Sequence, residues 1–392
     1  MTRLIGAHAS ARRRSLKAAL LLGVSVLIGS EARAQGPALT RGPYLQSTTR
    51  EAVTIVWQTD IAGDGVVEYG AQGTTQTAAD PASTTAHAIT LTELTAGTTY
   101  RYQVKTGGAA LYQATFTTAP DPGASFDFVV VGDTGSGFQE QFDVAAQMQA
   151  LGPDFILHTG DVIYPDGQPE GYAPFFFAPY QDLLDHAPIF PVLGNHDYHT
   201  ASGQPYLDVF YLPDASSGTE RYYSFDWGDA HFVALDSTPP AYADAAMLQW
   251  LQTDLAASTA RWSFVFFHHA MFTTGPHAAD TTLADMVATL EPVFSQYDVD
   301  IVFNGHDHAY ERSVPQNGVI YIVSGGGGAS LYDVSTGDDI FFAASAHHVV
   351  RVQLDGCILS LRAIDAAGAL LDQIALAKCP HNAYLPLLLK RR

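Results

Sequence analysis

The sequence predicts a small all-β domain followed by a larger α/β domain. Residues 36–120 contain short runs of β-branched and aromatic residues separated by Gly, Thr and Asp, without a helical period. Such a pattern is typical of a small β-sandwich. Residues 119–124 are rich in Pro and Gly, as expected of a linker. From 124 to 378, apolar strand-like runs alternate with helix-like segments, which indicates an α/β domain with largely buried sheets.

The pattern also predicts individual elements. In the first domain, strands are expected at 53–57 and 100–104. In the second domain, a mostly apolar run of buried-strand type covers 126–131. Further strands are predicted at 155–157, 189–193, 230–235, 262–267 and 301–304. Helices are predicted at 139–150, 243–257 and 281–297, and 347–377 returns to β-like runs.

Composition and charge exclude some functions. The chain has 392 residues, enough for two or three domains, and 47% of them are hydrophobic, which argues against wholesale disorder. The formal net charge is −21, and it becomes −26 without the first 34 residues, which hold six basic side chains and one acidic one. A surface of this sign repels phosphate backbones and anionic lipid. Nucleic-acid binding through a basic face is therefore not expected.

Both ends of the chain carry features of their own. Residues 1–34 combine a basic segment, an apolar run of signal-peptide length and the small-x-small site Ala32-Arg33-Ala34, which predicts a cleaved export signal. An anchored helix is the alternative, and Arg12-Arg13 resembles a twin-arginine signal. We therefore expect a periplasmic, cell-surface or extracellular protein without a stable membrane span. The tail 379–392 is interpreted as a sorting signal or as a last strand with a basic end.

Two cysteines occur, Cys357 and Cys379. In an exported chain a disulfide between them is the natural expectation, with two separate buried thiols as the alternative. Two thiols cannot form a Cys-only metal site.

Polar side chains follow five predicted strands at the points where those strands end. In open α/β sheets, groups at the carboxyl ends of strands converge on one crevice. Each motif alone could be a helix cap or a turn, but five in this order make a chance match negligible. The motifs are Gly132-Asp133-Thr134-Gly135, Gly160-Asp161-Val162-Ile163-Tyr164, Gly194-Asn195-His196-Asp197, His268 and Gly305-His306-Asp307-His308.

These residue types suit a site for two metal ions. Carboxylate oxygens, amide oxygens and neutral imidazoles fit first-row divalent and trivalent ions without a thiolate. A carboxylate such as Asp161 can bridge two ions. Two ions can bind phosphate oxygens, lower the pKa of a water and stabilise in-line displacement.

With these motifs the sequence resembles the purple acid phosphatases, of the metallophosphoesterase superfamily, over about residues 41–377. The resemblance implies a fibronectin type III-like domain at 36–120. Residues 94–102 resemble the loop that enters a late strand of such domains, with an ordinary hairpin turn as the alternative. The resemblance further implies a two-sheet metallophosphoesterase sandwich flanked by helices at 124–378. It implies that Fe(III) is held by Asp133, Asp161, Tyr164 and His308, and a second ion, Fe, Zn or Mn, by Asp161, Asn195, His268 and His306.

Further details narrow the subfamily and suggest substrate contacts. General metallophosphoesterases have a His where this chain has Gly135, and they lack an equivalent of Tyr164. A phenolate is therefore expected to replace an imidazole as a ligand of Fe(III). By the same resemblance, His196 and His277 bind substrate and act in catalysis. The chain departs from the family at Ala270, where the family usually has Pro, and at Ala278, where plant members carry a second His. His269, next to His268, is interpreted as structural or exposed.

The sequence thus predicts a secreted phosphomonoesterase that acts on small phosphate esters through a metal-bound hydroxide. Two alternatives stay open: a phosphodiesterase or nucleotidase that uses the same site, and an exported binding protein with an inactive phosphatase domain. The natural substrate and the oligomeric state are not predicted.

Overall fold

The computed structural model describes residues 36–73, 75–214 and 216–379. The expected export signal at 1–34 lies outside the described residues, as does the tail beyond Cys379. Within the described residues, no helix combines the length and apolar character that a membrane span needs.

Residues 39–117 form an all-β region, as predicted. Its sheet has the order β1-β2-β4-β5, and β3 pairs with β2. Trp57 is fully buried in its core, where the indole stacks on His87 and donates a 3.0 Å hydrogen bond to Thr106 Oγ1. The strands are β1 (Leu39–Gln46), β2 (Val53–Gly70), β3 (Gln76–Leu91), β4 (Thr99–Thr106) and β5 (Ala109–Thr117).

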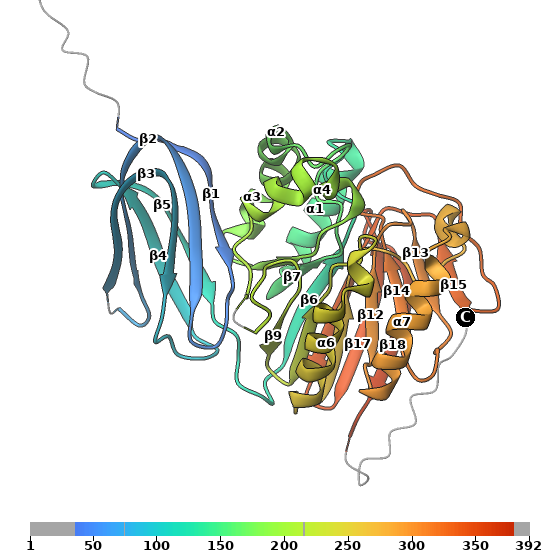
Figure 1. The fold of residues 1–392 in the computed structure, drawn as a ribbon. Coiled ribbons are helices and arrows are strands. Elements are labelled where there is room, and N and C mark those ends of the chain that lie inside the picture. The colour runs from blue at the N-terminus through green and yellow to red at the C-terminus, as the bar shows by residue number, and fades with distance from the viewer. Residues whose placement is uncertain (1–35, 74, 215, 380–392) are drawn as a thin grey trace, which may run out of the picture. The chain divides into compact units, whose positions relative to one another are not determined.

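The remaining described residues form the mixed α/β fold that the alternating pattern predicts, built on two sheets (Figure 1). The six-stranded sheet has the order β18-β17-β16-β6-β7-β8, and its strands are β6 (Phe126–Val131), β7 (Phe155–His158), β8 (Ile189–Pro191), β16 (His348–Asp355), β17 (Ile358–Asp365) and β18 (Leu370–Ala377). The seven-stranded sheet has the order β15-β13-β14-β12-β11-β10-β9. Its strands are β9 (Tyr223–Trp227), β10 (Ala230–Ala234), β11 (Trp262–Phe266), β12 (Ile301–Asn304), β13 (Tyr310–Ser313), β14 (Ile320–Ser324) and β15 (Ile340–Ala344).

Three helices longer than ten residues lie in the described part of this region, where the sequence predicts them. They are α1 (Gln139–Leu151), α6 (Ala245–Ala257) and α7 (Leu283–Gln296). A further helical segment at 169–184, with a π-helical turn at Tyr172–Phe177, has no counterpart in the sequence prediction. The short helices are α2 (Pro169–Gly171), α3 (Ala178–Leu184), α4 (Asn195–His199), α5 (Gln204–Leu207) and the 3₁₀ turns Ala201–Gly203, Ala241–Ala243 and Pro276–Ala279.

The side-chain period of the strands separates two cores in this region. On β10 and β11, Phe232 and Phe264 belong to one core together with Phe128 of β6. The residues next to them, Val233 and Val265, belong to a second core that contains side chains of α6 and α7. Successive strand residues point to opposite faces of a sheet. One face of the seven-stranded sheet therefore packs on the six-stranded sheet, and the other packs on α6 and α7 (Figure 1).

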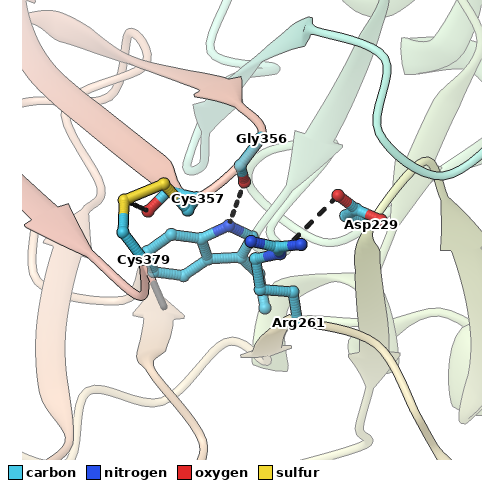
Figure 2. Close-up of a disulfide and its surroundings, with 6 residues drawn as sticks. Asp229, Arg261, Gly356, Cys357 and Cys379 are labelled. Carbon is cyan, nitrogen blue, oxygen red and sulfur yellow. Dashed lines mark hydrogen bonds and ion pairs between the residues drawn. A yellow bond between two sulfur atoms is a disulfide. The ribbon is translucent and has the colours of Figure 1, made fainter. Parts of the chain in front are cut away.

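A disulfide joins Cys357 to Cys379, so the expected pairing is confirmed (Figure 2). It links the turn between β16 and β17 to the end of β18, with the Cα atoms 4.9 Å apart. Beside it, Gly356 O accepts a 3.2 Å hydrogen bond from Trp262 Nε1, and Arg261 pairs with Asp229 at 3.7 Å.

We expect the double variant Cys357→Ala/Cys379→Ala to lose about 3 kcal/mol of folding stability. The two cysteines are 22 residues apart, and a cross-link over a loop of this length restricts the unfolded chain by roughly that amount. Urea denaturation of both proteins, with and without reductant, measures the loss. Reductant should lower the stability of the wild type to that of the variant. Equal stability of the two proteins without reductant would contradict the expectation.

A buried histidine should make the stability of the fold depend on pH. His231 of β10 lies 2.7 Å from Asp226 Oδ1 and 2.9 Å from Asp254 Oδ2. Burial alone would lower the pKa of His231, but the two carboxylates outweigh it and raise the pKa to about 9. Because the folded chain holds this proton more tightly than the unfolded chain, the contribution is full below pH ~6.5 and is lost as the pH rises through ~9.

We therefore expect His231→Gln to cost on the order of 3 kcal/mol at pH 6 and much less at pH 9.5. Denaturation of wild type and variant at the two pH values tests this. A cost that does not change with pH would show that His231 is neutral in the folded protein.

Candidate metal centre

The predicted ligands meet where parallel strands of the two sheets end. In the six-stranded sheet, β6, β7 and β8 run parallel, and the chain after them supplies Asp133, Asp161 and Asn195. In the seven-stranded sheet, β11 and β12 run parallel, and the chain after them supplies His268 and the 306–308 segment. Residues far apart in the sequence are thus brought to one place, as the carboxyl-end rule predicts.

One group of contacts surrounds the phenol of Tyr164. Its hydroxyl lies 3.0 Å from Asp133 Oδ1, 3.0 Å from Asp161 Oδ2 and 3.0 Å from His308 Nε2. The donor atoms of these four side chains therefore face a common point.

A second group surrounds the imidazole of His268. Its Nε2 lies 2.9 Å from Asn195 Oδ1, 3.1 Å from His306 Nδ1 and 3.3 Å from Asp161 Oδ2. Asp161 belongs to both groups. The structure thus brings all seven predicted ligand residues together, in two sets that share one carboxylate.

Three of the ligand residues have a strained backbone, and a glycine beside another ligand allows a close approach to Asp161. Asp133, Asp161 and His306 have φ values of 58°, 54° and 70°, a left-handed conformation that is rare for residues other than Gly. Strained backbone of this kind persists where the surrounding structure enforces it and clusters at functional sites. A Cβ at Gly194 would lie 2.1 Å from Asp161 Oδ1, so only Gly allows the Asn195 turn to approach this carboxylate.

The backbone around Gly135 leaves no room for a side chain, so a His does not fit at this position. A Cβ at this position would lie 2.0 Å from Val162 O. The backbone of Gly135 pairs instead with the segment that carries Tyr164, through hydrogen bonds of 3.1 Å to Val162 O and 3.0 Å from Tyr164 N. The close pairing that excludes a side chain at 135 is thus the same pairing that positions the phenol.

Backbone carbonyls determine which nitrogen of two histidines faces the centre. His268 Nδ1 lies 2.9 Å from Thr159 O, and His308 Nδ1 lies 2.7 Å from Ser330 O. Since a carbonyl oxygen can only accept, each Nδ1 carries the proton and donates it. Nε2 of both rings is therefore the nitrogen that faces the acidic side chains, and it is the atom that would bind a metal ion once its proton is displaced.

The electrostatics of the centre favour a bound cation. Asp133 and Asp161 are almost fully buried. Burial would raise the pKa of Asp161, but the neighbouring His268 and His196 lower it below its ordinary value, so the carboxylate is ionised. Burial and these two carboxylates raise the pKa of the Tyr164 phenol well above 10. A phenolate at this position would therefore need a cation beside it.

The two histidines expected to contact substrate border this centre. His196 N donates a 2.9 Å hydrogen bond to Asp161 Oδ1, and its ring lies 4.5 Å from the Tyr164 ring. The His277 ring lies 3.8 Å from the His306 ring. Both side chains are about one-third exposed, so they remain accessible to a molecule in solution.

Several residues at the site were missed in the sequence analysis. Asp197 is buried and accepts hydrogen bonds from Gly194 N at 2.9 Å and Val162 N at 3.1 Å, so it connects two loops that carry ligands. Burial, reinforced by Asp161, raises the pKa of Asp197 to about 7. Asp280 contacts His277, and the ring of Tyr332 stacks on that of His308 at 4.3 Å. His269, expected to be structural or exposed, lies 2.9 Å from Ser237 Oγ.

Comparisons with known proteins identify the class. Residues 126–310 match the family described as Calcineurin-like phosphoesterase. Residues 126–310 therefore form a domain of the calcineurin-like phosphoesterase type, whose members are hydrolases. Several of the curated relatives are purple acid phosphatases. Purple acid phosphatase 4 of Arabidopsis thaliana is 28% identical over 65% of this chain and 84% of its own length, and phosphoenolpyruvate phosphatase of Allium cepa is 28% identical over 76% and 66%.

A solved structure agrees in fold. The structure of purple acid phosphatase PPD1 from yellow lupin (Lupinus luteus) seeds has a TM-score of 0.73 and 19% identity, covering 91% of this chain and 77% of that one. The structure of PhoD has a TM-score of 0.63 at 14% identity. The α/β metallophosphoesterase fold is thus confirmed. The purple acid phosphatase relatives support a phosphatase function at a binuclear metal centre, and the Asp and His groups described above could bind metal.

Proposed function

We propose that the chain is an exported phosphomonoesterase that acts at a centre of Fe(III) and a divalent ion, Fe, Zn or Mn. The observation that carries this proposal is the arrangement of donors in two sets that share Asp161, with the Nε2 atoms of His268 and His308 facing inward. Carboxylate, phenol, amide and imidazole donors fit these ions.

The two sets divide the ligands between the ions. Asp133, Asp161, Tyr164 and His308 would hold Fe(III), and Asp161, Asn195, His268 and His306 would hold the divalent ion. When bound, the two ions stabilise negative charge on phosphoryl oxygens and lower the pKa of a water. Buried Asp161 keeps the sets in a fixed relation, because the Gly194 turn and His196 N both approach its carboxylate.

The chain's own side chains would bind and orient the ester. His196 and His277 border the centre and offer N–H groups to phosphate oxygens or to the departing alkoxide oxygen. None of these residues comes from 36–120, which we assign as a fibronectin type III-like domain preceding the catalytic domain at 124–378. Export rests on the sequence of 1–34, which precedes both.

Phosphate release from one aryl monoester and one aryl diester, measured from acid to alkaline pH on metal-loaded protein, tests the substrate class. We expect the monoester to be preferred, especially at acid pH. Preference for the diester would keep the centre but favour the phosphodiesterase alternative. Release from neither ester would favour an inactive binding protein.

The Tyr164→Phe variant tests the iron assignment. A phenolate on Fe(III) gives a visible charge-transfer band, which the iron-loaded wild type should show and the variant should lose. Tyr332→Phe is the matched control, since Tyr332 also contacts His308 but belongs to neither set. An unchanged band in Tyr164→Phe would contradict the assignment of this ligand.

A further inference from the structure

The carboxylate of Asp280 lies between two histidines of the centre. Its Oδ2 is 3.1 Å from His277 Nδ1 and 3.7 Å from His306 Nε2. The two rings lie against each other, with centroids 3.8 Å apart. One oxygen therefore faces both a proposed metal ligand and a proposed substrate contact.

The local fold fixes this position. His277 lies in the single 3₁₀ turn Pro276–Ala279 and Asp280 follows this turn directly, where Asp280 N donates a 3.0 Å hydrogen bond to His277 O. The chain is anchored just before this turn, because Thr273 Oγ1 lies within hydrogen-bond distance of Asp307 Oδ2 at 2.6 Å and of Glu311 Oε2 at 2.5 Å. Asp307 and Glu311 are fully buried, so the segment that carries Asp280 begins at a well-packed point.

His306 differs from the other two histidine ligands in the partner of the ring nitrogen that points away from the centre. His268 and His308 each donate an N–H to a backbone carbonyl. His306 turns Nδ1 toward His268 Nε2, so Nε2 is the nitrogen that must carry the proton if Nδ1 binds a metal. The described contact of that Nε2 is Asp280 Oδ2.

We propose that Asp280 is a positioning residue that orients His306 toward the divalent ion and holds His277 beside it. Its carboxylate accepts a hydrogen bond from His277 Nδ1 and lies opposite His306 Nε2 at ion-pair distance, so it couples the metal ligand to the group that contacts the phosphate ester. The part that concerns His277 rests on the proposed phosphatase function, whereas the part that concerns His306 requires only that the centre binds metal.

Asp280→Ala removes the acceptor, and Asp280→Asn retains an acceptor oxygen of the same reach. Outer partners of metal ligands typically change metal affinity or activity by 10–100-fold. We expect Asp280→Ala to weaken binding of the divalent ion by about that factor and to lower kcat more than it raises KM. Asp280→Asn should recover most of both losses. Asp285→Ala is the matched control, since Asp285 is an exposed carboxylate five residues later in α7.

Divalent-ion affinity is measured by competition with a chelator in the absence of substrate, and kinetics follow on fully loaded protein. Wild-type affinity and kcat in Asp280→Ala would overturn the proposal. A change in KM alone would make Asp280 a substrate contact, and a third ion present in wild type but absent from Asp280→Ala would make it a ligand. If the wild type binds two ions without releasing phosphate, the proposed function fails while the affinity comparison still tests the contact with His306.

Discussion

Asp161→Ala should abolish both metal loading and turnover. Asp161 is the side chain that belongs to both sets of donors, with Oδ2 3.0 Å from the Tyr164 hydroxyl and 3.3 Å from His268 Nε2. Its loss removes a donor from each set and leaves the buried imidazoles without their shared carboxylate. Because partners outside the ligand shell already cost 10–100-fold, we expect the loss of a shared ligand to lower kcat/KM by more than about a hundredfold.

The control for this experiment is Asp182→Ala, which removes an exposed carboxylate from α3. Metal content and phosphate release from an aryl monoester are measured on the same preparations, and circular dichroism confirms that each variant is folded. Full activity in Asp161→Ala would contradict the ligand assignment. Loss of activity in Asp182→Ala as well would show that the assay responds to charge rather than to the site.

Phe128→Ala should cause the largest loss of folding stability, about 3–5 kcal/mol. Phe128 of β6 is fully buried between the two sheets. Its ring lies 5.0 Å from Phe155 of its own sheet and 5.2 and 5.6 Å from Phe232 and Phe264 of the other. Truncation leaves a cavity that the surrounding rings can fill only in part.

Phe142→Ala is the control, since Phe142 is 39% exposed on α1 and its truncation should change stability by no more than about 0.5 kcal/mol. Urea denaturation of the two variants and the wild type gives the comparison. A cost below about 1 kcal/mol for Phe128→Ala would mean that the core between the sheets can close around the gap.

The convergence of the site could be predicted because it depends on topology. Asp133, Asp161, Asn195, His268 and His306 follow strands that local patterns identify, and the end of a buried parallel strand determines where the next residues lie. The predicted boundaries of α1 and α6 also agree with the structure to within two residues, and the buried positions of each helix recur every three or four residues, as a helix requires.

Other features could not be predicted because they depend on contacts between distant residues. Thr159 and Ser330 orient two imidazoles through their backbone carbonyls. Because every residue has a backbone carbonyl, the residue type does not indicate this role. The strands β9, β13 and β15 are short and gain much of their definition from pairing partners. Asp280 could have been noticed from its spacing of three residues from His277, but its contact with His306 crosses 26 positions.

The metal content of the purified, reconstituted chain tests the central claim most directly. Protein loaded with iron together with zinc or manganese and then freed of unbound ions is analysed by elemental analysis, with Asp161→Ala beside it. We predict two ions per chain in the wild type, one of them iron, and far fewer in the variant. A wild type that retains no ions, or an Asp161→Ala variant that retains as many as the wild type, would contradict the proposed binuclear centre.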